Sequence, residues 1–316
     1  MKLTQTDVWR GLAILVVFFV LAWLPVVPGA DGWLSIVVPI TMYTVLATSW
    51  AIFSGPTHYV SLATAAFFGV GSYTLALGLE SVPYPLLLLM AAVLGGVMAA
   101  LVGWATLRLS GVYFVIFTLG LAELIRQVFT WYQNNMGGSR GSYVFTEFTD
   151  KHIYWQLLAL ALLVYLVGWL INRSRLGFAI RIIGGDESVA KHSGINVAWS
   201  KIVLFMVSGS VAAVVGAILA PRFVYIEPAM AFNPQLSFMV VIMALLGGTQ
   251  RLWGPLMGAI PFALVWEFIA ANFPAQTTLL MGVAFLLVVF YIPNGISGVL
   301  IRWYHQLRAK PGVSHE

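Results

Sequence analysis

The sequence predicts an all-α polytopic membrane protein that forms a single transmembrane domain over residues 1–316. Hydrophobic residues make up 60% of the chain and charged residues only 9%, and the mean hydropathy of +0.93 is far above that of soluble domains. Apolar runs of about 20 residues, the length that a membrane-spanning helix needs, follow one another with short polar breaks. The alternating pattern of an outer-membrane barrel is absent, so helices are the expected spanning elements.

The apolar runs predict about ten spanning helices. We place them at residues 11–27, 33–53, 60–79, 84–106, 111–131, 153–171, 202–221, 235–248, 255–273 and 277–299. The segment 235–248 is short for a complete crossing, and we expect a broken or re-entrant element there.

The distribution of basic residues orients these helices. With the amino terminus inside, only Arg140, Lys151 and Arg222 fall outside, and Arg126 falls within a span. All other basic residues then collect on the cytoplasmic side, which is the positive-inside pattern of membrane proteins. We therefore predict that both termini are cytoplasmic and that residues 173–201 form a cytoplasmic loop.

The stretch "GGDESVAKHSGIN", residues 184–196, predicts a short polar helix in this loop. Its signals are an interruption at Gly184 and Gly185, the N-cap Asp186, the acidic Glu187 at the helix start, the basic Lys191 and His192 at the helix end, and the stop Gly194. A helix at about residues 186–194 is too short to be stable alone in water, so other parts of the protein must hold it. It is either a connector between two spans or a docking point for a soluble partner.

Several kinds of chemistry are not expected of this chain. It has no cysteine, and its five histidines show no metal-ligand spacing. No lysine follows a glycine, so the phosphate-binding GxxxxGK[ST] loop is absent. Nucleophile–base pairs and paired carboxylates at span depth are also missing. We expect no catalytic, cofactor or metal site, and the net charge of +5 belongs to membrane loops rather than to nucleic-acid binding.

Six stretches with small or polar residues interrupt the apolar sequence. They are "FSGPTHYVSLATAAFFGVGSYT" (residues 53–74), "LRLSGVYFVIFTLGLAELIRQV" (107–128), "NMGGSRG" (135–141), "RIIGGDESVAKHSGINVAWSK" (181–201), "LLGGTQRLWGPLMGA" (245–259) and "FYIPNGISGVL" (290–300). Their order and spacing resemble those of the Liv-type permeases, the membrane subunits of ABC importers for branched-chain amino acids, urea and short amides.

The resemblance implies a type II ABC importer-like permease fold in the bacterial inner membrane. It also implies a homologous second permease subunit, two cytoplasmic ABC ATPases and a periplasmic substrate-binding protein as partners. ATP and Mg²⁺ are then used by the ATPases, and the chain is a non-catalytic transport subunit. The short helix becomes the coupling helix, with an ATPase-coupling site at Gly185, Asp186, Glu187, Ala190, Lys191 and Gly194. Glu187, Ala190 and Lys191 are its expected contacts.

Four residues are candidates for the translocation path. Thr64 and Phe67 lie in a small-residue stretch that predicts either close helix packing or a polar route for the solute. The Phe67 ring is expected either to gate this route by excluding water or to face lipid. Glu123 shares a helix face with Arg126 and is expected to pair with it. Glu267 has no basic neighbour in its span, so we expect it to face a pore or a polar pocket.

Branched-chain amino acids are the first expected substrate, and urea or short-chain amides are the second. A second class of transporter also fits the sequence. In a secondary transporter, protons or sodium would drive transport through an ionisable residue within a span, here Glu123 or Glu267. That class favours inverted repeats, and no convincing repeat is visible in the sequence.

Overall fold

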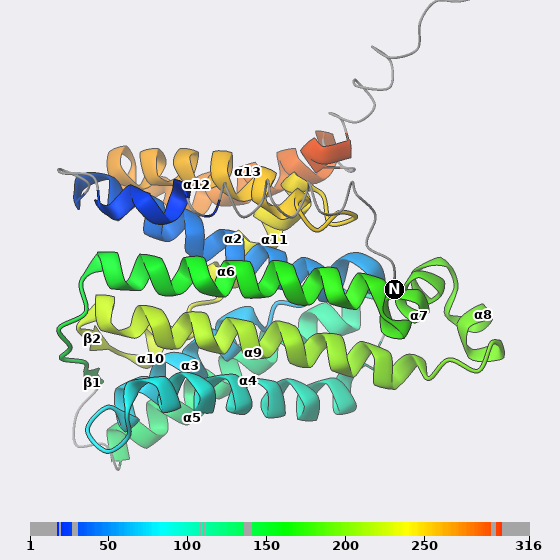
Figure 1. Cartoon of the computed structure of the whole chain (residues 1–316), viewed down its shortest axis with the longest axis horizontal. Helices are drawn as coiled ribbons and strands as arrows, with labels where there is room; N and C mark the ends of the chain where they lie inside the picture. The colour runs from blue at the N-terminus through cyan, green and yellow to red at the C-terminus, as the bar shows by residue number, and fades with distance from the viewer. Residues whose placement is uncertain are drawn as a thin grey trace, which may run out of the picture.

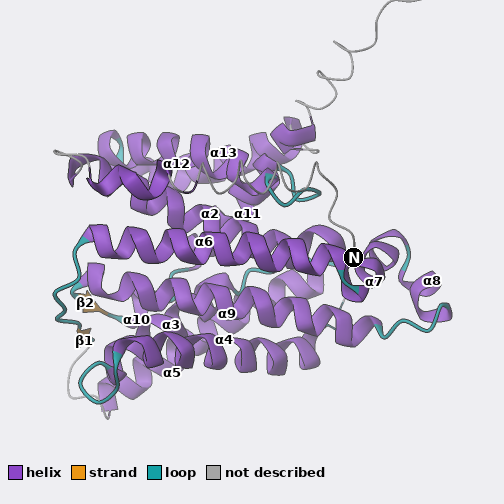
Figure 2. Cartoon of the chain, viewed as in Figure 1, coloured by secondary structure: helices purple, strands orange, loops and turns teal. Residues whose placement is uncertain are grey.

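The computed structural model describes residues 18, 20–26, 31–107, 109, 111–135, 141–291 and 295–298. These residues form a bundle of long helices that run roughly along one axis (Figure 1). Helix is the dominant structure throughout (Figure 2). Two short helices, α7 and α8, lie at one end of the bundle, hereafter the α8 end, and a two-stranded ribbon lies at the other, hereafter the ribbon end.

The described elements follow one another along the chain. They are η1 (Leu24–Val26), α2 (Asp31–Thr57), α3 (Thr64–Gly78), α4 (Tyr84–Thr106), α5 (Val112–Asn135), β1 (Ser142–Tyr143), α6 (Asp150–Arg173), α7 (Arg175–Gly185), α8 (Glu187–His192), α9 (Val197–Phe223), β2 (Tyr225–Ile226), α10 (Pro228–Ala231), α11 (Pro234–Gly247), α12 (Gly254–Asn272), η2 (Pro274–Gln276) and α13 (Thr277–Tyr291).

The predicted polytopic helical architecture is confirmed. Among the described residues, seven helices are long and apolar enough to cross a bilayer. Each predicted span from 33–53 to 277–299 overlaps one of the helices, although the predicted and observed ends differ. The first predicted span, 11–27, lies mostly outside the described residues, as do both termini and the glycine loop at 137–138.

Among the described residues the fold is helical, as expected, with a short ribbon in addition: β1 pairs antiparallel with β2 and joins the loop before α6 to the chain after α9. One sequence expectation needs correction. The span predicted at 60–79 begins as a helix only at Thr64, because residues 58–63 form neither helix nor strand. Composition did not reveal this, since residues 60–63, VSLA, are apolar enough to begin a span.

The irregular segment 58–63 enters the bundle from the α8 end. His58 takes a left-handed conformation (φ 58°) just after the end of α2. The Trp50 indole Nε1 then donates a hydrogen bond to the Ser61 carbonyl at 2.8 Å, which places Ser61 about two helical turns inside the end of α2. The Leu62 amide is bonded to the Thr118 hydroxyl at 3.0 Å. Irregular backbone at membrane depth requires such protein partners, because lipid offers none.

A second irregular element lies next to this one. The chain between β2 and α12 forms α10 and α11 with a break at Phe232 and Asn233, where the Asn233 side chain accepts a hydrogen bond from the Gln235 amide at 3.0 Å. The Ser237 hydroxyl, in the first turn of α11, accepts the Ala65 amide of α3 at 2.9 Å. The segment 235–248, expected to be broken or re-entrant, is instead one continuous helix, α11; the break lies just before it, and α11 abuts the first turn of α3.

Small residues bring α3 and α9 into close contact at the centre of the bundle. A Cβ atom added to Gly216 would lie 2.0 Å from the Phe68 carbonyl oxygen, and one added to Gly71 would lie 1.7 Å from the Ala213 carbonyl oxygen. The Ser72 hydroxyl also donates a hydrogen bond to the Gly216 carbonyl at 3.0 Å. Backbones this close need glycine at the contact, as is typical of membrane helix packing.

Candidate functional site

The short helix α8 begins and ends with well-formed caps. The Asp186 carboxylate accepts hydrogen bonds from the amides of Ser188 (2.6 Å) and Val189 (3.4 Å). At the other end Gly194 has φ +76° and its amide donates to the Lys191 carbonyl. This is the C-terminal arrangement that favours glycine. The predicted helix and both of its caps are confirmed, and α8 projects from the end of the bundle (Figure 1).

The start of α8 differs from the expectation in one respect. Gly185 does not interrupt the chain, because α7 continues through it and the helical path is broken at Asp186 (φ −158°). Gly184 serves a steric role instead. A Cβ atom added there would lie 2.5 Å from the Pro56 carbonyl oxygen, so this glycine allows α7 to pack on the end of α2.

Buried apolar side chains hold α8 against the bundle. Ala190 is fully buried in a small cluster with Ile183 of α7 and Val197 of α9. The expectation that Ala190 faces a partner is therefore wrong for its side chain, which anchors the helix instead. The opposite face is exposed and consists of Ser188, Val189, Lys191 and His192. Val189 is an apolar side chain with 54% of its surface exposed.

Glu187 turns toward the protein rather than fully toward solvent. Its Oε1 atom pairs with the Nζ atom of Lys201 on α9 and accepts a hydrogen bond from the Tyr59 hydroxyl at 3.4 Å. Lys201 Nζ also lies 4.0 Å from the centroid of the Tyr59 ring. Three segments distant in sequence thus meet at one carboxylate.

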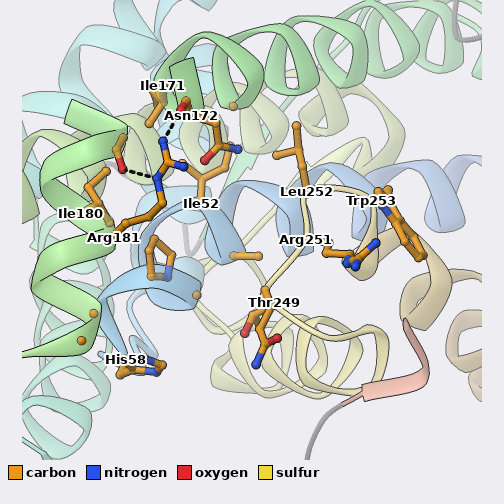
Figure 3. Close-up of a pocket in the computed structure, with 18 residues that line it drawn as sticks. Ile52, His58, Ile171, Asn172, Ile180, Arg181, Thr249, Arg251, Leu252 and Trp253 are labelled. Atoms are coloured by element: carbon orange, nitrogen blue, oxygen red, sulfur yellow. Dashed lines mark hydrogen bonds between the residues drawn. The ribbon is translucent and has the colours of Figure 1, made fainter. Parts of the chain in front are cut away.

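A large cavity of about 790 Å³ opens beside α7 at the α8 end (Figure 3). Its walls are the end of α2, the end of α6, α7 and the loop 249–253. Arg181 lies in this wall and donates hydrogen bonds to the carbonyls of Gly177 and Asn172, both at 3.1 Å. Arg251 lies over the Trp253 ring at 5.7 Å. None of the described residues that line the cavity is acidic, so its surface is basic.

The pair predicted on α5 is confirmed. Arg126 Nε donates to Glu123 Oε2 at 2.8 Å, and a second contact joins Nη2 to Oε1 at 2.5 Å. Gln127 also donates to Glu123 Oε1 at 2.8 Å. The Glu123 and Arg126 side chains keep 45% and 30% of their surface exposed. Only 17% of the apolar stretch of α5 is buried, so this polar cluster lies on an open helix face.

Glu267 lines a second cavity of about 470 Å³ toward the ribbon end. Segments of α2, α9, α11 and α12 form its walls. Arg222 lies in the same wall, where its Nε is 3.5 Å from an Asp150 carboxylate oxygen and its Nη2 donates to the Ser35 carbonyl at 3.4 Å. Apolar side chains, including Met42 and Trp266, complete the lining.

Thr64 and Phe67 line neither cavity. Thr64 is buried at the start of α3, and Phe67 is buried with its ring 5.4 Å from that of Phe205 in an edge-to-face contact. Neither sequence-based alternative for Phe67, a gate or a lipid-facing position, describes this core packing.

Basic residues gather unequally at the two ends of the bundle. The α8 end holds Arg173, Arg175, Arg181, Lys191, Lys201 and Arg251, and the ribbon end holds Lys151 and Arg222. Within the described part of the chain, no group of three or more His, Cys, Asp or Glu residues is arranged to hold a metal ion.

Comparison with known proteins decides the family. The family model described as "Branched-chain amino acid transport system / permease component" matches residues 32–291. The chain belongs to this permease family. The LivM branched-chain amino acid permease protein of Escherichia coli (strain K12) is 26% identical over 309 residues, covering 86% of this chain and 71% of that protein.

Two further relatives match the chain to different extents. The probable branched-chain amino acid permease protein LivM of Methanocaldococcus jannaschii is 23% identical over 231 residues, 67% of each chain. The ribose import permease RbsC of Haemophilus influenzae is 32% identical over 103 residues, 31% of this chain and 32% of that protein. No solved structure matches the chain significantly.

Sequence reasoning missed several residues that organise the site. Lys201 counted only as one positive charge at a span start, although a lysine this close to an apolar run signals burial with a partner. Tyr59, Thr118 and Ser237 gave no local signal, because their partners lie far away in the sequence.

Proposed function

We propose that the chain is a membrane-spanning permease subunit of an ABC importer in the bacterial inner membrane. The observation that carries this proposal is α8, a capped helix that projects from the basic end of the bundle and exposes Val189. The positive-inside pattern favours the α8 end as the cytoplasmic one, with both termini on that side. The loop 173–201 is then the cytoplasmic loop that presents the coupling helix.

The partners proposed at the α8 end are two ABC ATPases, one for this chain and one for a second permease. A short helix with a buried anchor and an exposed apolar side chain is suited to insert into a pocket of a soluble protein. Asp186 and Gly194 fix its ends, and Lys191 belongs to the face that meets the ATPase. ATP and Mg²⁺ are bound by these ATPases, and this chain transports without catalysing hydrolysis.

The second permease subunit is proposed to cover α5. An ion pair at membrane depth faces protein or water rather than lipid, because charged groups in hydrocarbon are costly. Glu123 and Arg126 lie on an open face of α5, which suits a route or an interface between two permeases. A periplasmic substrate-binding protein then meets the ribbon end.

Branched-chain amino acids are the proposed substrate. The family description and the LivM relatives support this choice, whereas the ribose relative resembles only a third of the chain. The cavity at the ribbon end also fits a small zwitterion with an apolar side chain, because it combines Arg222 and Glu267 with apolar walls. Urea or short-chain amides are the alternative solutes within the same class of importer.

Uptake by the reconstituted complex tests this proposal. The chain is purified from its native membrane in mild detergent, and its partners are identified and placed in liposomes with the binding protein. Recovery of two ATPases and ATP-dependent uptake of labelled leucine support it. ATP-dependent uptake of urea instead of leucine selects the alternative solute. Uptake by the chain alone, without ATP, replaces the proposal with an ion-coupled secondary transporter.

The pair on α5 gives a separate prediction. We expect Glu123→Ala and Arg126→Ala each to lower uptake by about tenfold, because each leaves one charge unpaired at membrane depth. Exchanging the two residues, Glu123→Arg with Arg126→Glu, is expected to keep more uptake than either removal. Initial rates of ATP-dependent uptake measure this, and a swapped variant no better than the single variants contradicts the pairing role.

A further inference from the structure

Lys201 is one of the largest fully enclosed side chains of the described core. It lies near the start of α9 and only 2% of its side chain is exposed. Buried lysines are rare unless they are paired, and this one has two partners. Its Nζ atom pairs with Glu187 of α8 and lies over the ring of Tyr59. The Tyr59 hydroxyl donates to the same Glu187 oxygen, which closes a triangle of contacts.

Tyr59 belongs to the irregular segment 58–63, and this segment is tied to several helices. The Tyr59 ring meets Phe114 of α5 edge to face, with centroids 5.2 Å apart. Further along, the Ser61 carbonyl accepts from Trp50 of α2, and the Leu62 amide donates to Thr118 of α5. A displacement of Tyr59 therefore acts on segments of α2 and α5.

The same segment leads directly into α3. Thr64 begins that helix, and the Ala65 amide is bonded to the Ser237 hydroxyl of α11. The contacts thus form a continuous physical connection from α8 through Lys201 and Tyr59 to the first turns of α3 and α11. Lys201, Ser61, Leu62 and Ala65 are buried, and packed side chains and hydrogen-bond networks of this kind can carry coupling between distant sites.

We infer that Lys201 is a positioning residue that couples the docking helix α8, through Glu187 and Tyr59, to the irregular segment 58–63 and hence to α3. The inference rests on the proposed docking of an ATPase at α8. The anchor at Ala190 holds α8 to α7 and to the start of α9 only, whereas the Lys201 contacts reach the irregular segment. Lys201 therefore affects the response of the membrane domain to ATP more than it affects ATPase binding.

The test follows movement of α3 directly, so it does not depend on which solute is carried. The chain has no cysteine, and an exposed Ser81→Cys in the turn after α3 can carry a fluorescent label. In the complete importer, ATP with vanadate is expected to change the label's fluorescence. With Lys201→Met we expect at least about a fivefold smaller change, while the ATPases copurify in normal amount.

Three variants make the result specific. Arg175→Met, which removes an exposed charge at the same end of the bundle, is the matched control and is expected to respond like the parent. Glu187→Gln is expected to weaken the response as Lys201→Met does. The double variant, Lys201→Met with Glu187→Gln, is expected to show a fluorescence change no smaller than that of either single variant. The reason is that the effects of residues that act as one unit are not additive. An additive loss overturns the inference.

The remaining outcomes also decide the question. A normal fluorescence change in Lys201→Met with ATPases bound overturns the inference and leaves the proposed function standing. Failure of the parent chain to recover any ATPase overturns both. If Lys201→Met does not fold, Tyr59→Phe replaces it, since that change removes only one hydroxyl. An unchanged response in Tyr59→Phe then overturns the inference, and a response at least about twofold smaller supports it.

Discussion

Val189→Asp is expected to reduce recovery of the ATPases with this chain by more than about tenfold, with no loss of the folded membrane domain. The Val189 side chain is 54% exposed at the tip of α8, whereas the anchor of the helix is Ala190 on the opposite face. A carboxylate placed in an apolar contact loses hydration without gaining a partner, so the cost falls on the interface. Copurification of the ATPases in mild detergent, followed by quantification of each subunit, measures the effect.

Val224→Asp is the matched control for this change. Val224 has a similar exposed fraction of 51%, but it lies beside β2 at the ribbon end, far from α8. Its backbone has φ +56°, a conformation that aspartate accepts more readily than valine. We expect normal ATPase recovery with this variant. Normal recovery with Val189→Asp would exclude the exposed face of α8 as the main docking contact.

Gly216→Val is expected to prevent accumulation of folded protein. A Cβ atom at this position would lie 2.0 Å from the Phe68 carbonyl oxygen, and both helices are enclosed by neighbours. Because no flexible side chain can move aside, α3 and α9 must separate, at a cost of about 3 kcal/mol or more. The separation also breaks the hydrogen bond from Ser72 to the Gly216 carbonyl. Size-exclusion profiles and thermal melting in detergent measure the loss.

Gly120→Val provides the comparison for this second change. No atom lies within 4 Å of a Cβ added to Gly120, which sits on the open face of α5. This variant is expected to fold and to melt like the parent chain when the subunit is studied alone. Equal yields of folded protein from both variants would show that the close approach of α3 and α9 is not required for the fold.

Most of the helices could be predicted from the sequence, because their signals are local. Apolar runs set the spans, and the caps Asp186 and Gly194 set the ends of α8. The pairing of Glu123 with Arg126 was equally local, since residues three apart share a helix face. The short length of 235–248 suggested an irregular element there, but these residues form a regular helix and the break falls at Phe232 and Asn233 before it.

What could not be predicted depends on contacts between distant segments. Residues 60–63 of the irregular segment have the composition of a span, and only the bonds of this segment to Trp50 and Thr118 explain why it is not helical. The burial of Ala190 and Phe67 likewise depends on helices that pack on them. The triangle of Tyr59, Glu187 and Lys201 follows from the tertiary fold alone.

The irregular start of α3 gives the protein a natural reporter of helix displacement. Most backbone amides of a membrane helix are bonded within their own helix and exchange their hydrogens slowly even when whole helices shift. The amides of Leu62 and Ala65 instead depend on hydroxyl groups contributed by α5 and α11. If α5 or α11 moves relative to α3, these two amides lose their partners first. Deuterium uptake at these positions would therefore time the conformational cycle of the unlabelled protein.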